Sequence, residues 1–381
     1  MSRNGSRASF GQLELADFEF ELPARCIAQY PPAERDGGRM MVLDRSTGAI
    51  EHHHVRELPR LLRGGDLLVV NATRVVAARL RGHKASGGRA EALLLGEIVG
   101  EAEGEVMDEV LSEVLGERHS NVPRENLSIR YRALLRHSGR IRLGAKYRLG
   151  TPALDAELVE FTDDGIAVLA FEPGTDPYRS GETPLPPYIR RPAPDPEDQQ
   201  RYQTTYARIP GSVAAPTAGL HLSQPLLDGL DTRGIERAEV VLHVGLGTFR
   251  PLTRENLETG RLHTESYELP ESTADAIART RARGGRVVAV GTTTARVLES
   301  CADSSGGVVA GCGKTDLLLA PGSRFQVVDA LLTNFHLPGS SLILLVAAFA
   351  GREAVLAAYA NAIQNDYRFY SYGDAMLIQP V

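Results

Sequence analysis

Short apolar segments that run into small polar residues constrain the fold of this chain more than any other feature. Leu67–Val70 is followed by Asn-Ala-Thr-Arg at 71–74, and Val287–Val290 by Gly-Thr-Thr-Thr at 291–294. Brief apolar runs ending in turn-forming residues are typical of buried strands, and the threonines are able to cap a helix predicted over Ala295–Cys301. Strands that alternate with helices predict an α/β fold. Further helices are predicted over 272–283 and 341–365.

Two loops rich in Gly, Pro, Thr and His lie in the same α/β region, within VAAPTAGLHL (213–222) and LHVGLGTF (242–249). Small residues let a backbone approach a ligand closely, while Thr and His supply a few hydrogen-bonding groups. Such loops meet at the carboxyl ends of strands, so we expect a ligand pocket there. The second loop lacks the third glycine and the following helix of a dinucleotide-binding fingerprint.

Three histidines lie in loops of this character, namely His221, His243 and His336. A lone histidine is usually structural, but three in similar loops favour a shared site. No metal-ligand spacing such as HExxH occurs, and GxSxG, P-loop and kinase motifs are absent.

The middle of the chain has a different pattern. From Arg74 to Phe171 apolar and polar residues alternate between Gly-rich turns, which predicts a small all-β module inserted into the α/β region. The Pro-rich segment TPLPPYI (183–189) carries the chain back. Within the module, 97–117 holds eight acidic residues and no basic one, with apolar pairs every four residues. We interpret it as a solvated helical insertion.

A run of cations follows this insertion. Between 128 and 150 all Lys and Arg residues stand at even positions, and no acidic residue interrupts them. Period two places them on one face of β-strands, and single-sign charge favours phosphate binding over a mixed solvated surface. The residues expected to bind RNA are Arg130, Arg132, Arg136, Arg140 and Arg142.

Aromatic residues are concentrated in YRFYSYGDAM (367–376), although they make up only 6% of the chain. A C-terminal strand that fills the core accounts for about half of these rings. The others, with Arg368 and Asp374, are suited to stacking on a base and binding its polar edge.

Composition limits the class of protein. The net charge is −6, and three cysteines (Cys26, Cys301 and Cys312) share no CxxC spacing. This argues against a disulfide framework and favours a reducing cytoplasm. The longest apolar stretch, 342–350, is too short to span a bilayer, so we expect no membrane association. We expect a monomer.

Beyond the two loops, the chain resembles the S-adenosylmethionine (AdoMet):tRNA ribosyltransferase-isomerase family. The resemblance rests on long, ordered segments that cover most of the chain outside the termini and the acidic insertion. They are YPPAERDGGRMMVLD (30–44), DLLVVNATRVVAARL (66–80), KASGGRAEALLL (84–95), TPLPPYI, YQTTYA (202–207), VGTTTARVLES (290–300), LLTNFHLP (331–338) and YRFYSYGDAM.

The resemblance implies a large α/β-barrel-like domain interrupted by a small antiparallel β-barrel. The expected divisions are a disordered N-terminal extension at 1–13, a discontinuous catalytic domain at 14–73 and 184–381, and a barrel domain at 74–183 with the insertion at 97–117.

The implied activity transfers and isomerises the ribosyl part of AdoMet onto 7-aminomethyl-7-deazaguanine at the wobble position of a tRNA anticodon. Adenine and methionine leave, epoxyqueuosine-tRNA forms, and AdoMet is a consumed substrate without a metal or other cofactor. The expected catalytic residues are His221, His243, His336 and Asp374. The expected AdoMet and base pocket comprises Asn71, Thr73, Arg74, Pro216, Thr217, Gly219, Gly245, Gly247, Thr248, Thr292, Thr293, Asn334, Arg368 and Tyr372.

Two other functions fit part of the sequence. An AdoMet-dependent methyltransferase would use Gly245 and Gly247 in its cofactor loop, but it needs a doubly wound sheet and an acidic residue after the next strand, which the pattern does not support. A non-enzymatic RNA-binding protein would explain the cations but not the His- and Thr-containing loops.

Overall fold

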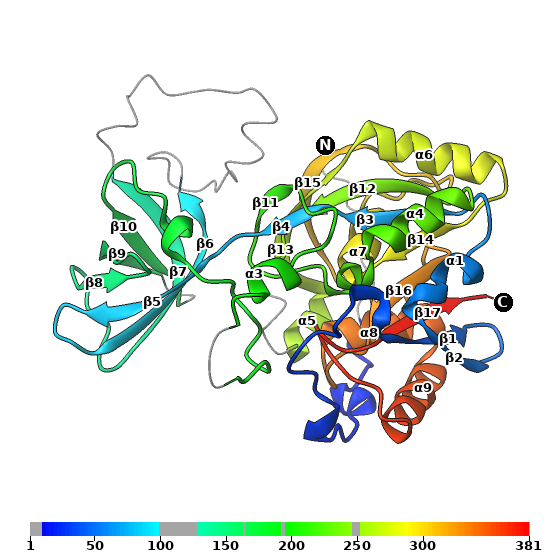
Figure 1. The fold of residues 1–381 in the computed structure, drawn as a ribbon, viewed down its shortest axis with the longest axis horizontal. Coiled ribbons are helices and arrows are strands. Elements are labelled where there is room, and N and C mark those ends of the chain that lie inside the picture. Colours follow the sequence, from blue (N-terminus) through cyan, green and yellow to red (C-terminus); the bar gives the residue numbers. More distant parts are fainter. Residues whose placement is uncertain (1–9, 99–127, 163–164, 192–194, 246–251, 381) are drawn as a thin grey trace.

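The computed structural model describes residues 10–98, 128–162, 165–191, 195–245 and 252–380. These form a large α/β body and a smaller β-barrel that lies beside it, at the left of Figure 1. The fold class predicted from the sequence is confirmed.

A nine-stranded mixed sheet forms the centre of the large body, in the order β15-β13-β12-β3-β14-β16-β17-β1-β2. Strands β12, β3, β14 and β16 are parallel, whereas β17 is antiparallel to β16 and parallel to β1. The carboxyl ends of the four parallel strands therefore share one edge with the amino ends of β17 and β1. The strands are β1 Arg39–Asp44, β2 Ile50–His54, β3 Leu67–Asn71, β12 Glu236–Leu242, β13 Arg261–Leu269, β14 Val287–Val290, β15 Gly311–Leu317, β16 Ala330–Asn334 and β17 Ala375–Gln379.

Helices cover both faces of this sheet, because its central strands are apolar on both sides. In β3, Leu67 and Val69 pack with α6, α7, α8 and α9, while Leu68 and Val70 pack with α1 and α4. The α-helices are α1 Leu58–Leu61, α3 Asp198–Arg201, α4 Gln224–Thr232, α5 Arg254–Thr259, α6 Glu271–Ala282, α7 Thr292–Ser300, α8 Ser341–Ala350 and α9 Arg352–Gln364. The short 3-10 helices are η1 Leu15–Phe18, η2 Ala24–Cys26, η3 Arg35–Gly37, η4 Val55–Glu57, η6 Pro177–Ser180 and η7 Thr217–His221.

The barrel is closed, with strand order β10-β7-β6-β5-β8-β9 and antiparallel neighbours. Alternate residues such as Leu80, Ala92 and Tyr147 fill its interior. A two-stranded ribbon of β4 (Thr73–Val75) and β11 (Ile209–Ser212) lies where the chain leaves the large sheet. The barrel strands are β5 Arg79–Lys84, β6 Arg89–Ile98, β7 Ile129–His137, β8 Lys146–Leu149, β9 Leu154–Phe161 and β10 Ala167–Phe171.

The single helix predicted over 341–365 is wrong. Helices α8 and α9 replace it and meet at an angle of 114°. Gly351 separates them with a φ of 89°, a left-handed conformation that glycine adopts without steric cost. No single described helix has the length and apolarity needed to cross a bilayer, although this bent pair passes the same test when both members are taken together.

Other differences concern segment boundaries. Phe10 is buried and its amide nitrogen donates to the Leu257 carbonyl at 2.9 Å, so the predicted disordered extension is packed from Phe10 onward; residues 1–9 lie outside the described residues. Strand β4 pairs with β11 and not with the barrel. Of the predicted acidic insertion, only Glu97 and Ile98 are described, as the end of β6.

Candidate active site at the sheet edge

Asn71 ties together three elements at the carboxyl edge of the sheet. Its amide nitrogen donates to the Leu242 carbonyl at 3.0 Å and to Thr293 Oγ1 at 3.3 Å. Its amide oxygen accepts from the backbone nitrogens of Thr73 and Leu242, both at 3.1 Å. The fully buried side chain therefore fixes the ends of β3 and β12 against the first turn of α7.

His243 extends this group. Its Nδ1 lies 2.9 Å from Thr73 Oγ1, and its ring faces Gly211 of β11. A Cβ at Gly211 would lie 2.9 Å from Cε1 of the ring, and φ there is 139°, so both space and backbone conformation demand glycine. We call Asn71, Thr73, His243 and Thr293 the Asn71 cluster.

A second group forms where β16 ends and β17 begins. Asn334 Nδ2 lies 3.1 Å from His221 Nε2 and 3.1 Å from the Tyr370 carbonyl oxygen. A carbonyl oxygen is only an acceptor, so the amide atom that faces it must be the nitrogen. The nitrogen of this amide therefore faces His221, and Nε2 of the neutral ring accepts while Nδ1 carries the proton. Burial lowers the pKa of His221 to about 4, although nearby Asp374 opposes this shift. The imidazole is neutral at pH 7.

Asp374 lies next to this ring and is only 2% exposed. Its carboxylate accepts from the backbone nitrogens of Arg39 at 3.0 Å and Arg368 at 2.7 Å. The guanidinium groups of the same two arginines lie 3.7 Å from the carboxylate. Gly38 faces both acidic and imidazole groups, since a Cβ there would be 3.6 Å from Asp374 Oδ1 and 3.7 Å from His221 Nδ1. We call His221, Asn334 and Asp374 the Asp374 cluster.

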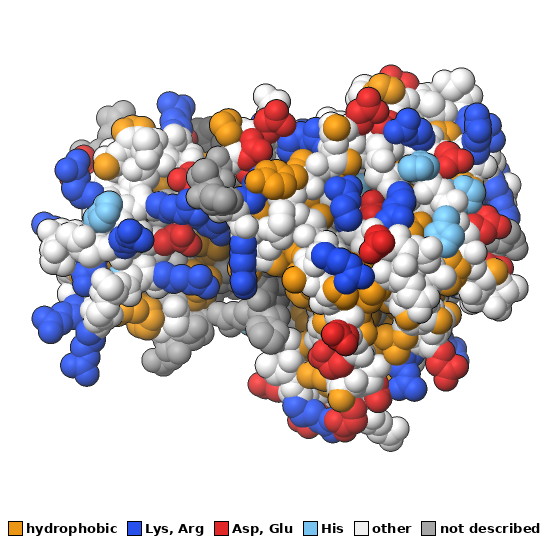
Figure 2. All heavy atoms as spheres, turned by 60° about the horizontal axis from the view of Figure 1, so that its bottom comes forward, with side chains coloured by type: hydrophobic (Ala, Val, Ile, Leu, Met, Phe, Trp, Pro, Cys, Tyr) orange, Lys and Arg blue, Asp and Glu red, His pale blue; other side chains and the backbone are white. Residues whose placement is uncertain are grey.

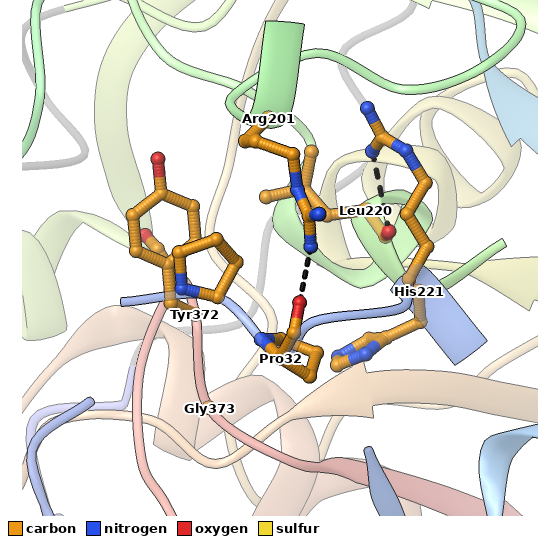
Figure 3. Close-up of a pocket in the computed structure, with 9 residues that line it drawn as sticks. Pro32, Arg201, Leu220, His221, Tyr372 and Gly373 are labelled. Carbon is orange, nitrogen blue, oxygen red and sulfur yellow. Dashed lines mark hydrogen bonds between the residues drawn. The ribbon is translucent and has the colours of Figure 1, made fainter. Parts of the chain in front are cut away.

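A cavity opens beside His221 (Figure 3). Its volume is about 10 Å³, room for roughly one water-sized group, whereas pockets for whole small molecules measure ~300–1,000 Å³. As its walls stand, the cavity does not hold a whole small molecule. The lining residues are Pro31, Pro32, Arg35, Arg201, Leu220, His221, Ser371, Tyr372 and Gly373.

Two arginines give this cavity a positive wall. Arg35 donates to the Gln203 carbonyl at 2.7 Å, and Arg201 donates to the Pro32 carbonyl (Figure 3). Neither forms an ion pair with an acidic group among the described residues. Burial, then the charge of Arg201, lowers the pKa of Arg35. Neither arginine was predicted from the sequence to have a role, although both lie in or next to segments that carry the family resemblance.

His336 is not brought to the cavity. Its Nε2 lies 2.8 Å from Thr333 Oγ1, and its backbone nitrogen donates to the Tyr359 hydroxyl at 2.9 Å. Burial lowers its pKa to about 3. These contacts are those of a neutral core histidine.

The other predicted pocket residues fall into several places. Gly219 packs against Tyr206, whose hydroxyl would lie 2.0 Å from an added Cβ, so close packing accounts for this glycine. Arg74 is exposed, and Gly247 and Thr248 lie outside the described residues. Pro216 immediately precedes η7 and Thr217 begins it, and η7 contacts β16. Gly245 follows β12, and Thr292 begins α7 after β14.

The aromatic segment is buried rather than displayed, and its strand begins only at Ala375. Phe369 is in the main core, and Tyr370 packs on Tyr188 with ring centroids 4.6 Å apart. Tyr372 lines the cavity, and its hydroxyl donates to the Asp198 carboxylate at 2.9 Å.

The run of cations between 128 and 150 lies on the barrel exterior, as the alternation predicted. Arg130 and Arg136 are exposed on β7, whereas Tyr131 is buried. The single-sign interpretation weakens, because neighbouring strands contribute acidic residues: Glu91 of β6 lies opposite Arg136 in the strand register, and Glu157 of β9 lies opposite Lys146. Arg132 is partly buried, and Arg140 and Arg142 are exposed in the connection to β8. No group of three His, Cys, Asp or Glu side chains placed to hold a metal is found in the described parts of the chain.

Comparisons with known proteins identify the family of the chain. The profile of a family described as "Queuosine biosynthesis protein" matches residues 15–378. The chain is 47% identical over 368 residues to an S-adenosylmethionine:tRNA ribosyltransferase-isomerase of Pelobacter propionicus, covering 95% of this chain and 99% of the relative. A relative of the same name from Gloeobacter violaceus is 48% identical, with 95% of each chain covered. The crystal structure of S-adenosylmethionine tRNA ribosyltransferase from Thermotoga maritima is similar with a TM-score of 0.51 and 35% identity, covering 95% of this chain and 99% of that one.

Proposed function

This chain belongs to the queuosine biosynthesis protein family, and we propose that it is an S-adenosylmethionine:tRNA ribosyltransferase-isomerase. It transfers the ribosyl part of AdoMet to a tRNA base and isomerises it, with release of adenine and methionine. The base is 7-aminomethyl-7-deazaguanine at the anticodon wobble position, the product is epoxyqueuosine-tRNA, and the reaction occurs in the cytoplasm.

The structural observation that supports this proposal is that the Asn71 and Asp374 clusters both lie along the carboxyl edge of the parallel strands. The chemistry needs a base to remove a proton beside the sulfonium, donors for the departing adenine, and groups that hold the acceptor amine close. The two clusters offer two imidazoles, a buried carboxylate, amides and hydroxyls at that edge.

The hydrogen bonds suggest a division of roles between the histidines. His221 has Nε2 occupied by Asn334 and a pKa of about 4, so at neutral pH it acts through its Nδ1–H as a neutral donor. That donor suits the departing adenine or an oxygen of the ribose. His243 is partly exposed and oriented through Nδ1 by Thr73, which suits a proton-transfer group.

The positive wall of the cavity suggests how an anionic group is held. Arg35 and Arg201 face the cavity without an acidic partner among the described residues. We assign them to a carboxylate or phosphate of the substrates, since guanidinium groups bind both bidentately.

AdoMet is consumed in this proposal, and no metal or redox cofactor takes part. The test incubates the protein with AdoMet and precursor-bearing tRNA and quantifies adenine and methionine by chromatography. Equimolar release that persists in EDTA, with the tRNA fold intact, is expected. Release that EDTA abolishes and a divalent ion restores would refute the metal-free step, and absence of adenine would refute ribosyl transfer.

A further inference from the structure

A second hollow, larger than the cavity at the sheet edge, lies on the outside of the barrel across β5, β6, β7 and β8. Its volume is about 1010 Å³. It follows β5 from Arg81 toward the β5–β6 turn, the end of the barrel that points away from the large sheet in Figure 1. We call it the barrel groove.

The barrel groove is strongly basic. Its lining contains five Lys and Arg residues and one Glu, a balance of +4 (5 − 1 = 4), together with His83 and His137. The described barrel strands and turns, 79–98 and 128–171 without 163–164, carry eleven Lys and Arg and five Asp and Glu (11 − 5 = +6), in a chain of net charge −6. Figure 2 shows Lys and Arg side chains gathered over this half of the molecule. The five cations are Arg81, Lys84, Arg89, Arg136 and Arg148.

Three of these cations are available to a ligand. Arg81 is paired with Glu182 at 3.2 Å, and Arg148 lies 3.6 Å from Asp155. In the described part of the chain, Lys84, Arg89 and Arg136 form no ion pair, and the Lys84 ammonium donates only to the Ser138 carbonyl at 3.0 Å. These three charges lie on three adjacent strands or their ends.

The chemistry of the lining selects the type of ligand. The lining of the groove has no Phe, Tyr or Trp and no large aliphatic side chain, so it lacks both the large rings on which bases usually stack and the apolar wall of a small-molecule pocket. Cations spread along an open surface match regularly spaced phosphates instead.

We propose that the barrel groove binds the sugar-phosphate backbone of the substrate tRNA at a part remote from the anticodon. The proposal rests on the proposed function, because the reacting base must reach the sheet edge of the large body. An RNA that extends from there along the barrel brings a different arm to the groove. Binding is independent of sequence, and it favours full-length tRNA over a short RNA carrying the same base.

The test compares Lys84→Ala/Arg89→Ala with Arg233→Ala/Arg324→Ala, a control pair of exposed arginines on the large body. Each protein is titrated with full-length precursor-bearing tRNA and with its isolated anticodon stem-loop at several salt concentrations. Two lost phosphate contacts flatten the slope of log affinity against log salt by about 1.4–1.8. If wild type and variant bind equally at 1 M salt, this change of slope makes the variant bind full-length tRNA roughly 10–30-fold more weakly at about 0.15 M salt.

The stem-loop is expected to bind and react equally with the groove variant and the control. An unchanged slope and affinity for full-length tRNA in the folded groove variant would overturn the proposal. So would an equal loss with the stem-loop, because the groove would then contact the anticodon arm. A failure of the proposed enzymatic function would be recognised separately, because wild-type protein would then form no product from either RNA.

Discussion

Acidification should destabilise the large body through its two buried neutral histidines. Burial lowers the pKa of His221 to about 4 and that of His336 to about 3, from 6.5 in an unfolded chain. Between pH 6.5 and the folded-state pKa, the unfolded chain binds a proton that the folded protein does not, so stability falls as pH falls through this window. A pH of 5 lies 1.5 units below the unfolded-state pKa, so each buried ring lowers the free energy of unfolding by about 2 kcal/mol at that pH.

Two such rings lower the free energy of unfolding by about 4 kcal/mol between pH 7.5 and 5, a large part of the ~5–15 kcal/mol that holds a typical domain folded. His336→Gln should reduce this loss by about 2 kcal/mol, whatever its constant cost, because only the ring titrates. The measurement is urea unfolding at both pH values, followed by the helical circular dichroism signal, which in the described residues comes from the large body. His83→Gln, an exposed position on the barrel, serves as the control. A His336→Gln protein that loses as much stability as wild type would refute the buried, neutral state of this histidine.

Two further predictions concern packing around the site. Gly219→Ala should destabilise the protein by about 1–3 kcal/mol through overpacking. Adding Tyr206→Phe should restore part of this loss, because it removes an unpartnered hydroxyl that would lie 2.0 Å from the new Cβ. Thermal unfolding of the single and double variants measures both effects, and a double variant no more stable than Gly219→Ala would contradict the clash. Arg296→Met should lower the free energy of unfolding by about 3–5 kcal/mol, because it leaves Glu265 buried and unpaired. Adding Glu265→Gln should recover most of this loss. If the effects of the two substitutions are additive, the two residues do not act as a pair. Because Glu265 also accepts from the Gly245 nitrogen at 3.0 Å, AdoMet binding should weaken in the single variant, which calorimetry can measure.

The parts of the fold that the sequence predicts are those encoded by local patterns. The apolar runs that became β3 and β14 end at the predicted polar residues, so their place at the sheet edge followed from strand chemistry alone. The break between α8 and α9 depends on one glycine within an otherwise helical pattern. Nothing local distinguishes a tolerated glycine from one at φ 89°.

The candidate site was predicted less completely, because its contacts join distant segments. Glu91 lies opposite Arg136 in the strand register although 45 residues separate them in the sequence, so the run of cations gave no sign of this acidic neighbour. Arg35 and Arg201 are far apart in the sequence, and only the folding of the chain brings both of them to the cavity. His336 shares its loop composition with His221, and both rings are buried. Only their partners differ, Thr333 for His336 and Asn334 for His221, and these contacts are set by the folded chain.

The central claim is that the ribosyl carbons of AdoMet, and not its methyl group, are transferred to tRNA. The most direct measurement supplies AdoMet labelled either in the ribose or in the methyl group, and follows each label into precursor-bearing tRNA by mass spectrometry of the anticodon nucleosides. The ribose label should appear in the modified nucleoside while the methyl label leaves with methionine. Methyl label in the tRNA without ribose label would contradict the account and identify a methyltransferase, and no label in tRNA would leave only RNA binding.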